Sequence, residues 1–146
     1  MEVLTSRTII HPGDLDRTLA FYRDDLGLAV AREFGDGAHR GVVFFAGGGL
    51  IEVTGGGSAP PTPGPDHAEQ ARRGVVLWLQ VRDLDASLVD LASRAVPVIR
   101  PAALEPWGLI EAWIEDPDGL RIHLVEVPDD HPLRRDLRGT TDEDRS

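Results

Sequence analysis

Three amino acids are missing from this chain of 146 residues: cysteine, lysine and asparagine. The lack of cysteine excludes disulfides, thiolate zinc sites and cysteine nucleophiles. The lack of lysine excludes Schiff-base chemistry on a lysine side chain, and arginine supplies all 15 basic residues. We interpret these gaps as a compositional bias of the source genome rather than as a feature of function.

Positive charge and long apolar runs are also scarce. The 15 arginines are outnumbered by 25 Asp and Glu residues, which gives a formal net charge of −10. No basic patch of the kind that binds nucleic acid is visible, so we expect no nucleic-acid partner. An acidic surface favours solubility and could also attract a cationic ligand. No apolar segment approaches the roughly 20 residues that span a bilayer, and the N-terminus lacks a signal-peptide pattern, so we expect a cytoplasmic protein without a membrane partner.

The first 54 residues predict one helix among four strands. The β-branched segment 3–10 predicts a strand, and Asp14 can cap a helix after the break at Pro12–Gly13. Apolar residues at helical spacing give that helix a single buried face: Leu15, Leu19, Tyr22 and Leu26. Gly27 ends the helix. Three more strands are predicted, over residues 29–34, 41–46 and 50–54.

The same β-α-β-β-β order returns after residues 55–73, which are rich in Gly, Pro and Ser and indicate a linker. A strand over residues 74–81 is followed by a helix with Asp83 as its cap. Further strands are predicted over residues 95–99, 109–115 and 120–127, the last two joined by the strong turn sequence Asp-Pro-Asp-Gly. A shift of 69 positions (83 − 14) carries the first cap and helix face onto the second: Asp83, Leu84, Leu88 and Leu91.

An internal repeat explains this match in register better than chance does. We therefore predict an α+β fold in which two tandem β-α-β-β-β modules, residues 1–54 and 74–127, form a cupped mixed β-sheet. Residues 55–73 are the linker between them, and residues 128–146 are a polar C-terminal tail. Because one helix covers only one face of each sheet, the other face must line a partner module or a cavity.

Two segments carry a resemblance to a known family. DLDRTLAFYRDDLGL (14–28) and EDPDGLRIHLVE (115–126), in the context of two β-α-β-β-β modules, resemble the first-helix and C-terminal signatures of the vicinal oxygen chelate superfamily. That superfamily includes glyoxalase I, bleomycin-resistance proteins, fosfomycin-resistance enzymes and extradiol dioxygenases. The resemblance covers residues 3–127. It implies the glyoxalase/bleomycin-resistance/dioxygenase fold, a small-molecule site in the cup and commonly a homodimer, but no particular reaction.

The resemblance also points to four positions where members of the family bind a metal ion. In this chain they are occupied by Arg7, Glu52, Val76 and His123. Arginine and valine cannot ligate a metal, so two ligands remain where zinc, nickel or iron sites usually need three. We therefore expect no tightly bound cofactor. A weakly held divalent metal at Glu52 and His123, completed by water or Glu111, is the alternative.

The two-residue period of strands predicts which other side chains share the cup. Alternation from Arg7, Val76 and His123, together with the family's hairpin pattern, places several residues inward: His11, Trp78, Gln80, Glu111, Trp113, Glu115 and Arg121. Trp107, next to Gly108, could cover the pocket from a loop. An aromatic, concave pocket with a few polar groups is typical of a ligand site. The candidate ligand-binding residues are Trp78, Trp113, Glu111, His11, Gln80 and Trp107.

Two functions fit these residues. In the first, the protein is a lyase- or isomerase-type enzyme for a small oxygenated metabolite: Arg7 pairs with Glu52 in place of a metal, and His123 and Glu52 carry proton transfer. In the second, it sequesters an aromatic ligand between Trp78 and Trp113 without turnover, as bleomycin-resistance proteins do. A structural Arg7–Glu52 ion pair without chemistry, or a partner domain without a small-molecule role, also fits.

Overall fold

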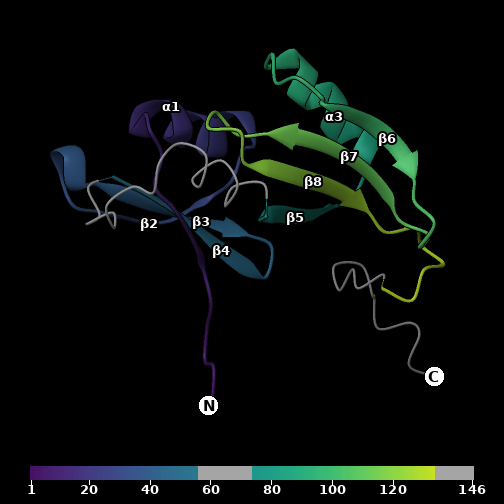
Figure 1. Cartoon of the computed structure of the whole chain (residues 1–146), viewed down its shortest axis with the longest axis horizontal. Coiled ribbons are helices and arrows are strands. Elements are labelled where there is room, and N and C mark those ends of the chain that lie inside the picture. The colour runs from purple at the N-terminus through teal and green to yellow at the C-terminus, as the bar shows by residue number, and fades with distance from the viewer. Residues whose placement is uncertain (56–73, 134–146) are drawn as a thin grey trace, which may run out of the picture.

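The computed structural model describes residues 1–55 and 74–133 of the chain. The first module contains β1 (Thr8–Ile10), α1 (Leu15–Ala20), the π-helical turn η1 (Phe21–Asp25), β2 (Val30–Phe34), the 3-10 turn η2 (Gly37–His39), β3 (Gly41–Ala46) and β4 (Gly49–Thr54). The second contains β5 (Val76–Val81), α3 (Leu84–Ser93), β6 (Arg100–Leu104), β7 (Ile110–Glu115) and β8 (Arg121–Glu126). The predicted α+β order, β-α-β-β-β twice, is confirmed (Figure 1). Most of the predicted linker, and the tail from residue 134 onward, lie outside the described residues.

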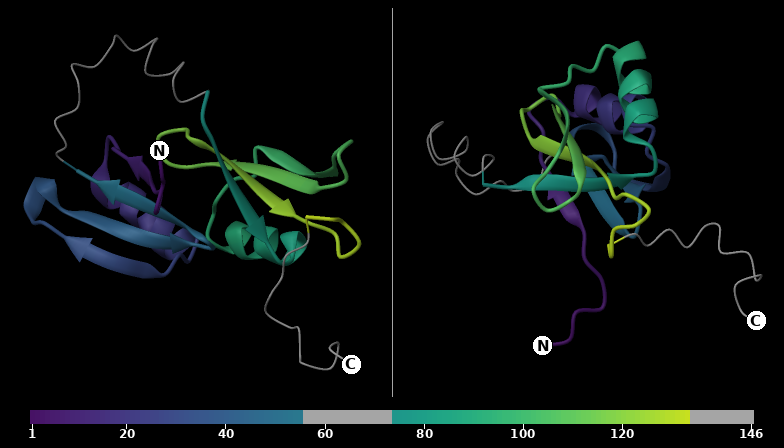
Figure 2. Two further views of the ribbon diagram at one scale, coloured as in Figure 1. Left: turned by 90° about the horizontal axis from the view of Figure 1, so that it is seen from below. Right: turned by 90° about the vertical axis from the view of Figure 1, so that its right-hand side faces the viewer.

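Each module has one four-stranded mixed sheet. The strand order is β1-β4-β3-β2 in the first and β5-β8-β7-β6 in the second. The first strand of each sheet is parallel to the last, and the other pairings are antiparallel. The helices α1 and α3 lie on the same side of the molecule (Figures 1 and 2). We call the sheet faces that point away from these helices the cup faces.

Both helices begin at the predicted aspartates. The Asp14 carboxylate accepts a hydrogen bond from the backbone N–H of Arg17 at 3.0 Å, and the Asp83 carboxylate accepts one from Ala86 at 2.8 Å. These caps satisfy N–H groups that have no partner inside the helix. The first helical segment runs to Asp25, close to its predicted end at Gly27, but only Leu15–Ala20 is α-helical and the rest is the π-helical turn η1. Neither helix, nor any other in the described ranges, is long and apolar enough to cross a bilayer.

The strand register supports the internal repeat. Ile9 pairs with Glu52 in the first sheet, and Trp78, which lies 69 positions after Ile9, pairs with His123 in the second. Glu52 and His123 therefore occupy equivalent places in the two modules. The copies kept one architecture while the side chains at this place diverged.

The predicted strand over residues 3–10 is too long. Only Thr8–Ile10 pairs with a neighbouring strand. Thr8 pairs with Ile51, and β4 begins only two residues earlier at Gly49, so a longer β1 would run past the end of its partner. Residues 1–7 are consequently exposed and outside the sheet.

The predicted strand over residues 95–99 is wrong. Ala95 has a positive φ of 59°, and its N–H and that of Val96 bond back to α3, so the chain is still leaving the helix here. The strand β6 begins at Arg100 and includes Pro101. Proline is tolerated there because β6 is an edge strand, and its register is irregular between Arg100 and Ala103.

A buried hydrogen bond joins the two modules. Tyr22, which is fully buried, donates its phenol proton to Asp116 Oδ2 at 3.1 Å, and Asp116 itself is 5% exposed. Asp116 Oδ1 accepts the N–H groups of Asp118 and Leu120, both at 2.9 Å. Burial raises the pKa of Tyr22 and of Asp116. Tyr22 therefore stays a hydrogen-bond donor, and one hydrophobic core encloses this contact with residues of both modules.

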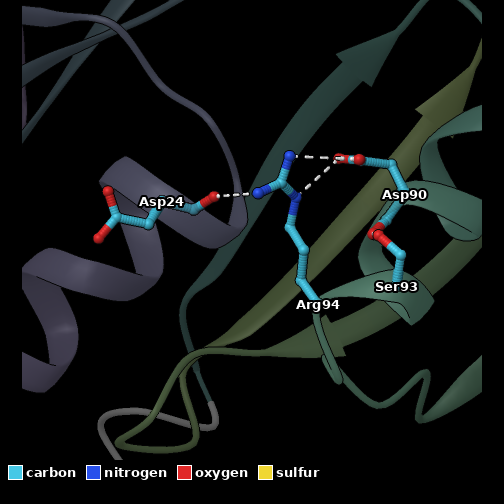
Figure 3. A network of polar contacts seen from close by, with 4 residues as sticks. All are labelled: Asp24, Asp90, Ser93 and Arg94. Carbon is cyan, nitrogen blue, oxygen red and sulfur yellow. Dashed lines mark hydrogen bonds and ion pairs between the residues drawn. The ribbon is translucent and has the colours of Figure 1, made fainter.

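A second tether lies at the end of α3 (Figure 3). The Arg94 guanidinium bonds the carboxylate of Asp90, one turn earlier, at 3.2 and 3.3 Å, and it donates to the backbone oxygen of Asp24 in η1 at 3.0 Å. The Ser93 hydroxyl donates to the backbone oxygen of Asp90 at 2.6 Å. These groups are exposed, so water and salt weaken them. Their effect is to orient η1 against α3 rather than to add much stability.

Replacing Tyr22 by phenylalanine keeps the ring and removes only the donor to Asp116. We expect the free energy of unfolding to fall by about 1–3 kcal/mol, because a buried carboxylate oxygen loses its partner. Urea unfolding measures this change. In the control, Asp116→Asn should lower the free energy of unfolding by less in the Tyr22→Phe background than in the wild type, because the two side chains share one hydrogen bond. An unchanged unfolding free energy would show that the bond does not stabilise the junction.

Candidate functional site

The cup face of the second module carries most of the side chains predicted for a site. Paired residues on neighbouring strands point to the same face of a sheet, so the register defines rows across it. One row crosses all four strands: Trp78, His123, Trp113 and Arg100. The rows beside it are Gln80, Val125, Glu111 and Ala103, and Val76, Arg121 and Glu115. The second-module residues predicted to point inward from strands thus share one face.

At the centre of this face, His123 meets a buried carboxylate. His123 Nδ1 lies 3.5 Å from Glu111 Oε2, with 21% of the histidine side chain and 6% of the glutamate side chain exposed. The other oxygen, Oε1, accepts the indole N–H of Trp107 at 3.1 Å. An ionised Glu111 favours the imidazole tautomer that carries its proton on Nδ1. Nε2 of His123 is then an unprotonated base.

Aromatic and cationic groups flank the imidazole. The ring of Trp113 stacks on His123 with centroids 4.7 Å apart and planes 2° from parallel. The guanidinium carbons of Arg100 and Arg121 lie 4.6 and 5.0 Å from the centroid of Trp113, a cation–π arrangement. Burial lowers the pKa of His123; the charge of Glu111 opposes this, and the two arginines reinforce it. The imidazole is therefore neutral at neutral pH and able to accept a proton.

On the first module the structure brings Arg7 and Glu52 together. Arg7 Nη1 donates to Glu52 Oε2 at 2.8 Å. The sequence suggested a buried pair, but the Arg7 side chain is 44% exposed and that of Glu52 is 13% exposed. Arg7 is exposed because it lies before the first residue of β1. His11, just after β1, is exposed as well.

The donor set does not fit a metal site of the kind that the resemblance implies. Within residues 1–55 and 74–133, no three His, Asp or Glu side chains gather as ligands. Glu52 contacts Arg7, whereas His123 contacts Glu111 on the other sheet. A weak site that joins Glu52 and His123 stays a prediction, and we assign no step of the chemistry to a metal.

A cavity of about 540 Å³ lies at the junction of the modules. Its walls come from the turn after η1, the β3–β4 turn, β5 and α3, and they include Asp25 and Asp90. It meets the cup face at Trp78 and Gln80, whereas His123 and Glu111 do not line it. This cavity could hold part of a ligand against Trp78, but it does not enclose the His123–Glu111 contact.

Several contacts of the site were not predicted. Arg100 forms a close ion pair with Glu105 at the edge of the cup face. His131 Nε2 lies 3.1 Å from the backbone oxygen of Trp107, so the segment after β8 reaches the loop that bonds Glu111. Alternation along β6 would have revealed Arg100 if the bounds of that strand had been predicted correctly. No periodic pattern in the sequence marks His131.

Comparison with known proteins places these features in a family. Residues 6–124 match the family model described as Glyoxalase/Bleomycin resistance protein/Dioxygenase superfamily. A probable lactoylglutathione lyase from Synechocystis sp. is 28% identical over 127 residues, which cover 82% of this chain and 92% of that protein. A solved superfamily member from Sphaerobacter thermophilus is 26% identical, with a TM-score of 0.63 over 86% of this chain and 98% of its own. TnmS3, an antibiotic binding protein from Streptomyces sp., shares the fold at 20% identity, with a TM-score of 0.64 over 88% and 100% of the two chains.

The titration of His123 tests the environment of the site. We expect its pKa to lie below that of histidine in an unstructured peptide, because burial penalises the charged ring. The folded protein then binds this proton less readily than the unfolded chain, so stability falls as pH drops below the ordinary pKa of histidine. His123→Gln should remove that part of the loss. NMR titration of the ring and urea unfolding across pH measure both effects, and a raised pKa would contradict them.

Proposed function

Because the chain belongs to the Glyoxalase/Bleomycin resistance protein/Dioxygenase superfamily, we propose that it is a lyase- or isomerase-type enzyme in which His123 transfers a proton on a small oxygenated substrate. The observation that carries this proposal is the contact between His123 and the buried carboxylate of Glu111. A histidine with a lowered pKa and a carboxylate at Nδ1 is a neutral base ready to act at Nε2.

The proposed reaction is a proton shift between neighbouring carbons. Nε2 of His123 takes the proton from a hydroxyl-bearing carbon next to a carbonyl group, and the electron pair moves onto the carbonyl oxygen to give an enediolate. The proton returns to the former carbonyl carbon while the hydroxyl proton passes to the oxygen on that carbon. The first carbon becomes the new carbonyl, so the product is an isomer of the substrate. Glu111 orients the imidazole and stabilises its charged form, while Arg100 and Arg121, which lie over Trp113, supply positive charge near the imidazole that could stabilise an oxyanion formed there.

The hemithioacetal of a 2-oxoaldehyde and glutathione is the first substrate to test. Its conversion to a 2-hydroxyacyl thioester is a proton shift of this type, and a relative with 28% identity is named probable lactoylglutathione lyase. On the first module, Arg7 is partly exposed beside Glu52 and available to an anionic group of the substrate. Arg7 stands where the family places a metal ligand, so we propose a reaction that needs no bound metal.

We propose that the active form is a homodimer. Four large apolar residues on or beside the two cup faces are exposed in the single chain: Ile9 (51%), Phe45 (53%), Val76 (40%) and Trp78 (47%). Large apolar side chains exposed on sheet faces often belong to an interface. A second copy of the chain would cover it and shield the imidazole of His123 from water, which strengthens the electrostatic contacts around a reacting proton.

Ligand sequestration without turnover is the alternative function. The cavity at the module junction, with Trp78 in its wall, favours it. The form suggested by the sequence, with a ligand held between Trp78 and Trp113, does not suit the register: His123 lies between the two in the same row and stacks on Trp113. A sequestered ligand would instead lie against Trp78 alone.

Substitution of His123 by glutamine tests the proposed chemistry. If wild-type protein forms the thioester from the hemithioacetal, kcat in His123→Gln should fall by about 100- to 10,000-fold, the usual contribution of a general base. Glu111→Gln should lower kcat less, because the base remains. His39→Gln, on η2 of the first module, is the matched control. Thioester formation at the wild-type rate in His123→Gln would overturn the assignment, and ligand quenching of tryptophan fluorescence without any turnover would favour sequestration.

Metal analysis tests the metal-free part of the proposal. Protein purified without chelator should contain no stoichiometric zinc, nickel, iron or manganese, because the four family positions supply only two side chains able to ligate. Its activity should be unchanged by dialysis against EDTA. A stoichiometric metal that is lost in Glu52→Ala would show that Glu52 binds a metal and would overturn the metal-free proposal.

A further inference from the structure

The loop between β6 and β7 is closed by its own backbone. The N–H of Gly108 donates to the backbone oxygen of Glu105 at 2.9 Å, and the N–H of Glu105 donates to the backbone oxygen of Leu109 at 2.8 Å. Gly108 has a φ of +87°, a conformation that residues with a side chain rarely adopt. The position of Trp107 in this turn is thus set by hydrogen bonds and by one glycine.

The side chain of Trp107 is oriented by a bond rather than by burial. Trp107 is 58% exposed, yet its Nε1 donates to Glu111 Oε1 at 3.1 Å. A hydrogen bond to a buried, charged acceptor is stronger than one between neutral groups. With Oε1 occupied in this way, Oε2 of Glu111 faces Nδ1 of His123. Three side chains therefore link an exposed loop to the imidazole.

The segment after β8 holds the same loop from the outside. The N–H of Leu133 donates to Nδ1 of His131 at 3.1 Å, so the proton of the neutral ring lies on Nε2. Nε2 then donates to the backbone oxygen of Trp107, 3.1 Å away. The ring also packs against Gly108, where an added Cβ would lie only 3.2 Å from Cδ2 of His131. A larger residue at position 108 would push His131 away.

We propose that Trp107 is a positioning residue for His123, and that His131 keeps Trp107 in place. The indole N–H prevents the Glu111 carboxylate from turning, and the second oxygen of that carboxylate keeps the proton of His123 on Nδ1. Without the indole donor the carboxylate can turn, and the neutral imidazole shifts toward the tautomer that carries its proton on Nε2. In that tautomer Nε2 cannot accept a proton from the substrate. The inference rests on the proposed function only for its effect on catalysis, since these contacts belong to the free protein.

The tautomer of His123 tests this directly. The chain has five histidines, so the ¹⁵N spectrum of the imidazole nitrogens is simple, and His123→Gln assigns the signal. We expect Nδ1–H in the wild type and a larger share of Nε2–H in Trp107→Phe, which keeps an aromatic ring but lacks the donor. Trp78→Phe is the matched control. Trp78 is also an exposed indole and lies in the same row as His123. It does not orient Glu111, because the two oxygens of that carboxylate contact Trp107 and His123. It should leave the tautomer unchanged.

His131→Ala is the second variant, and it leaves β7 and β8 untouched. It should shift the tautomer in the same direction as Trp107→Phe but less, because Trp107 keeps its N–H. Both side chains are at least partly exposed, so we expect both variants to fold, which urea unfolding checks. An unchanged tautomer in folded Trp107→Phe would overturn the role of Trp107. An unchanged tautomer in folded His131→Ala would overturn the role of His131.

Kinetics separate positioning from substrate binding. Trp107→Phe should lower kcat by up to about 100-fold, the cost of a misplaced catalytic group, with KM nearly unchanged. A rise in KM with unchanged kcat would make Trp107 a binding residue and overturn the inference. If the tautomer shifts as expected while wild-type protein converts no substrate, the proposed function fails and the positioning of His123 by Trp107 stands.

Discussion

Asp116 joins the two modules and also sets the geometry of the candidate site. It lies in the turn between β7 and β8, where one oxygen accepts two N–H groups of the turn and the other accepts the phenol of Tyr22. The turn fixes the pairing of β7 with β8, and this pairing places His123 opposite Trp113 with Glu111 in the adjacent row. The carboxylate that anchors the first module thus also holds the hairpin on which the proposed chemistry depends.

Most of the fold could be predicted because it is encoded in short, repeated patterns. The caps at Asp14 and Asp83 bond N–H groups three residues away, so a few adjacent residues are enough to specify them. Alternation within strands, counted from the positions that the family resemblance marks and joined to the family's hairpin pattern, likewise predicts that Trp78, Trp113 and His123 share a face. The predicted strand bounds were wrong where they depend on a neighbouring strand. The length of β1 depends on where β4 begins, and β6 tolerates a proline because it has a neighbouring strand on one side only.

The partner of His123 could not be found in this way. The family resemblance suggests Glu52, but Glu52 contacts Arg7 and His123 contacts Glu111. Which carboxylate lies nearest depends on the register of a hairpin and on a loop held by His131, a residue 24 positions from Trp107. Contacts between distant parts of a chain leave no periodic trace in its sequence. The two modules share their strands, but the equivalent residues Glu52 and His123 have partners of opposite charge. Glu52 contacts a cation, Arg7, whereas His123 contacts an anion, Glu111.

The two guanidiniums beside Trp113 bear on how long a proton can stay on the imidazole. A charged His123 would form near two permanent positive charges, with Glu111 as the close counter-charge. Burial adds to the cost of that charged state. The charged ring is therefore disfavoured relative to the neutral one, and a proton on it is readily given up. Such a base suits reactions in which the same proton leaves and returns during one encounter with the substrate, and it is poorly suited to those in which the proton must wait for a second reactant.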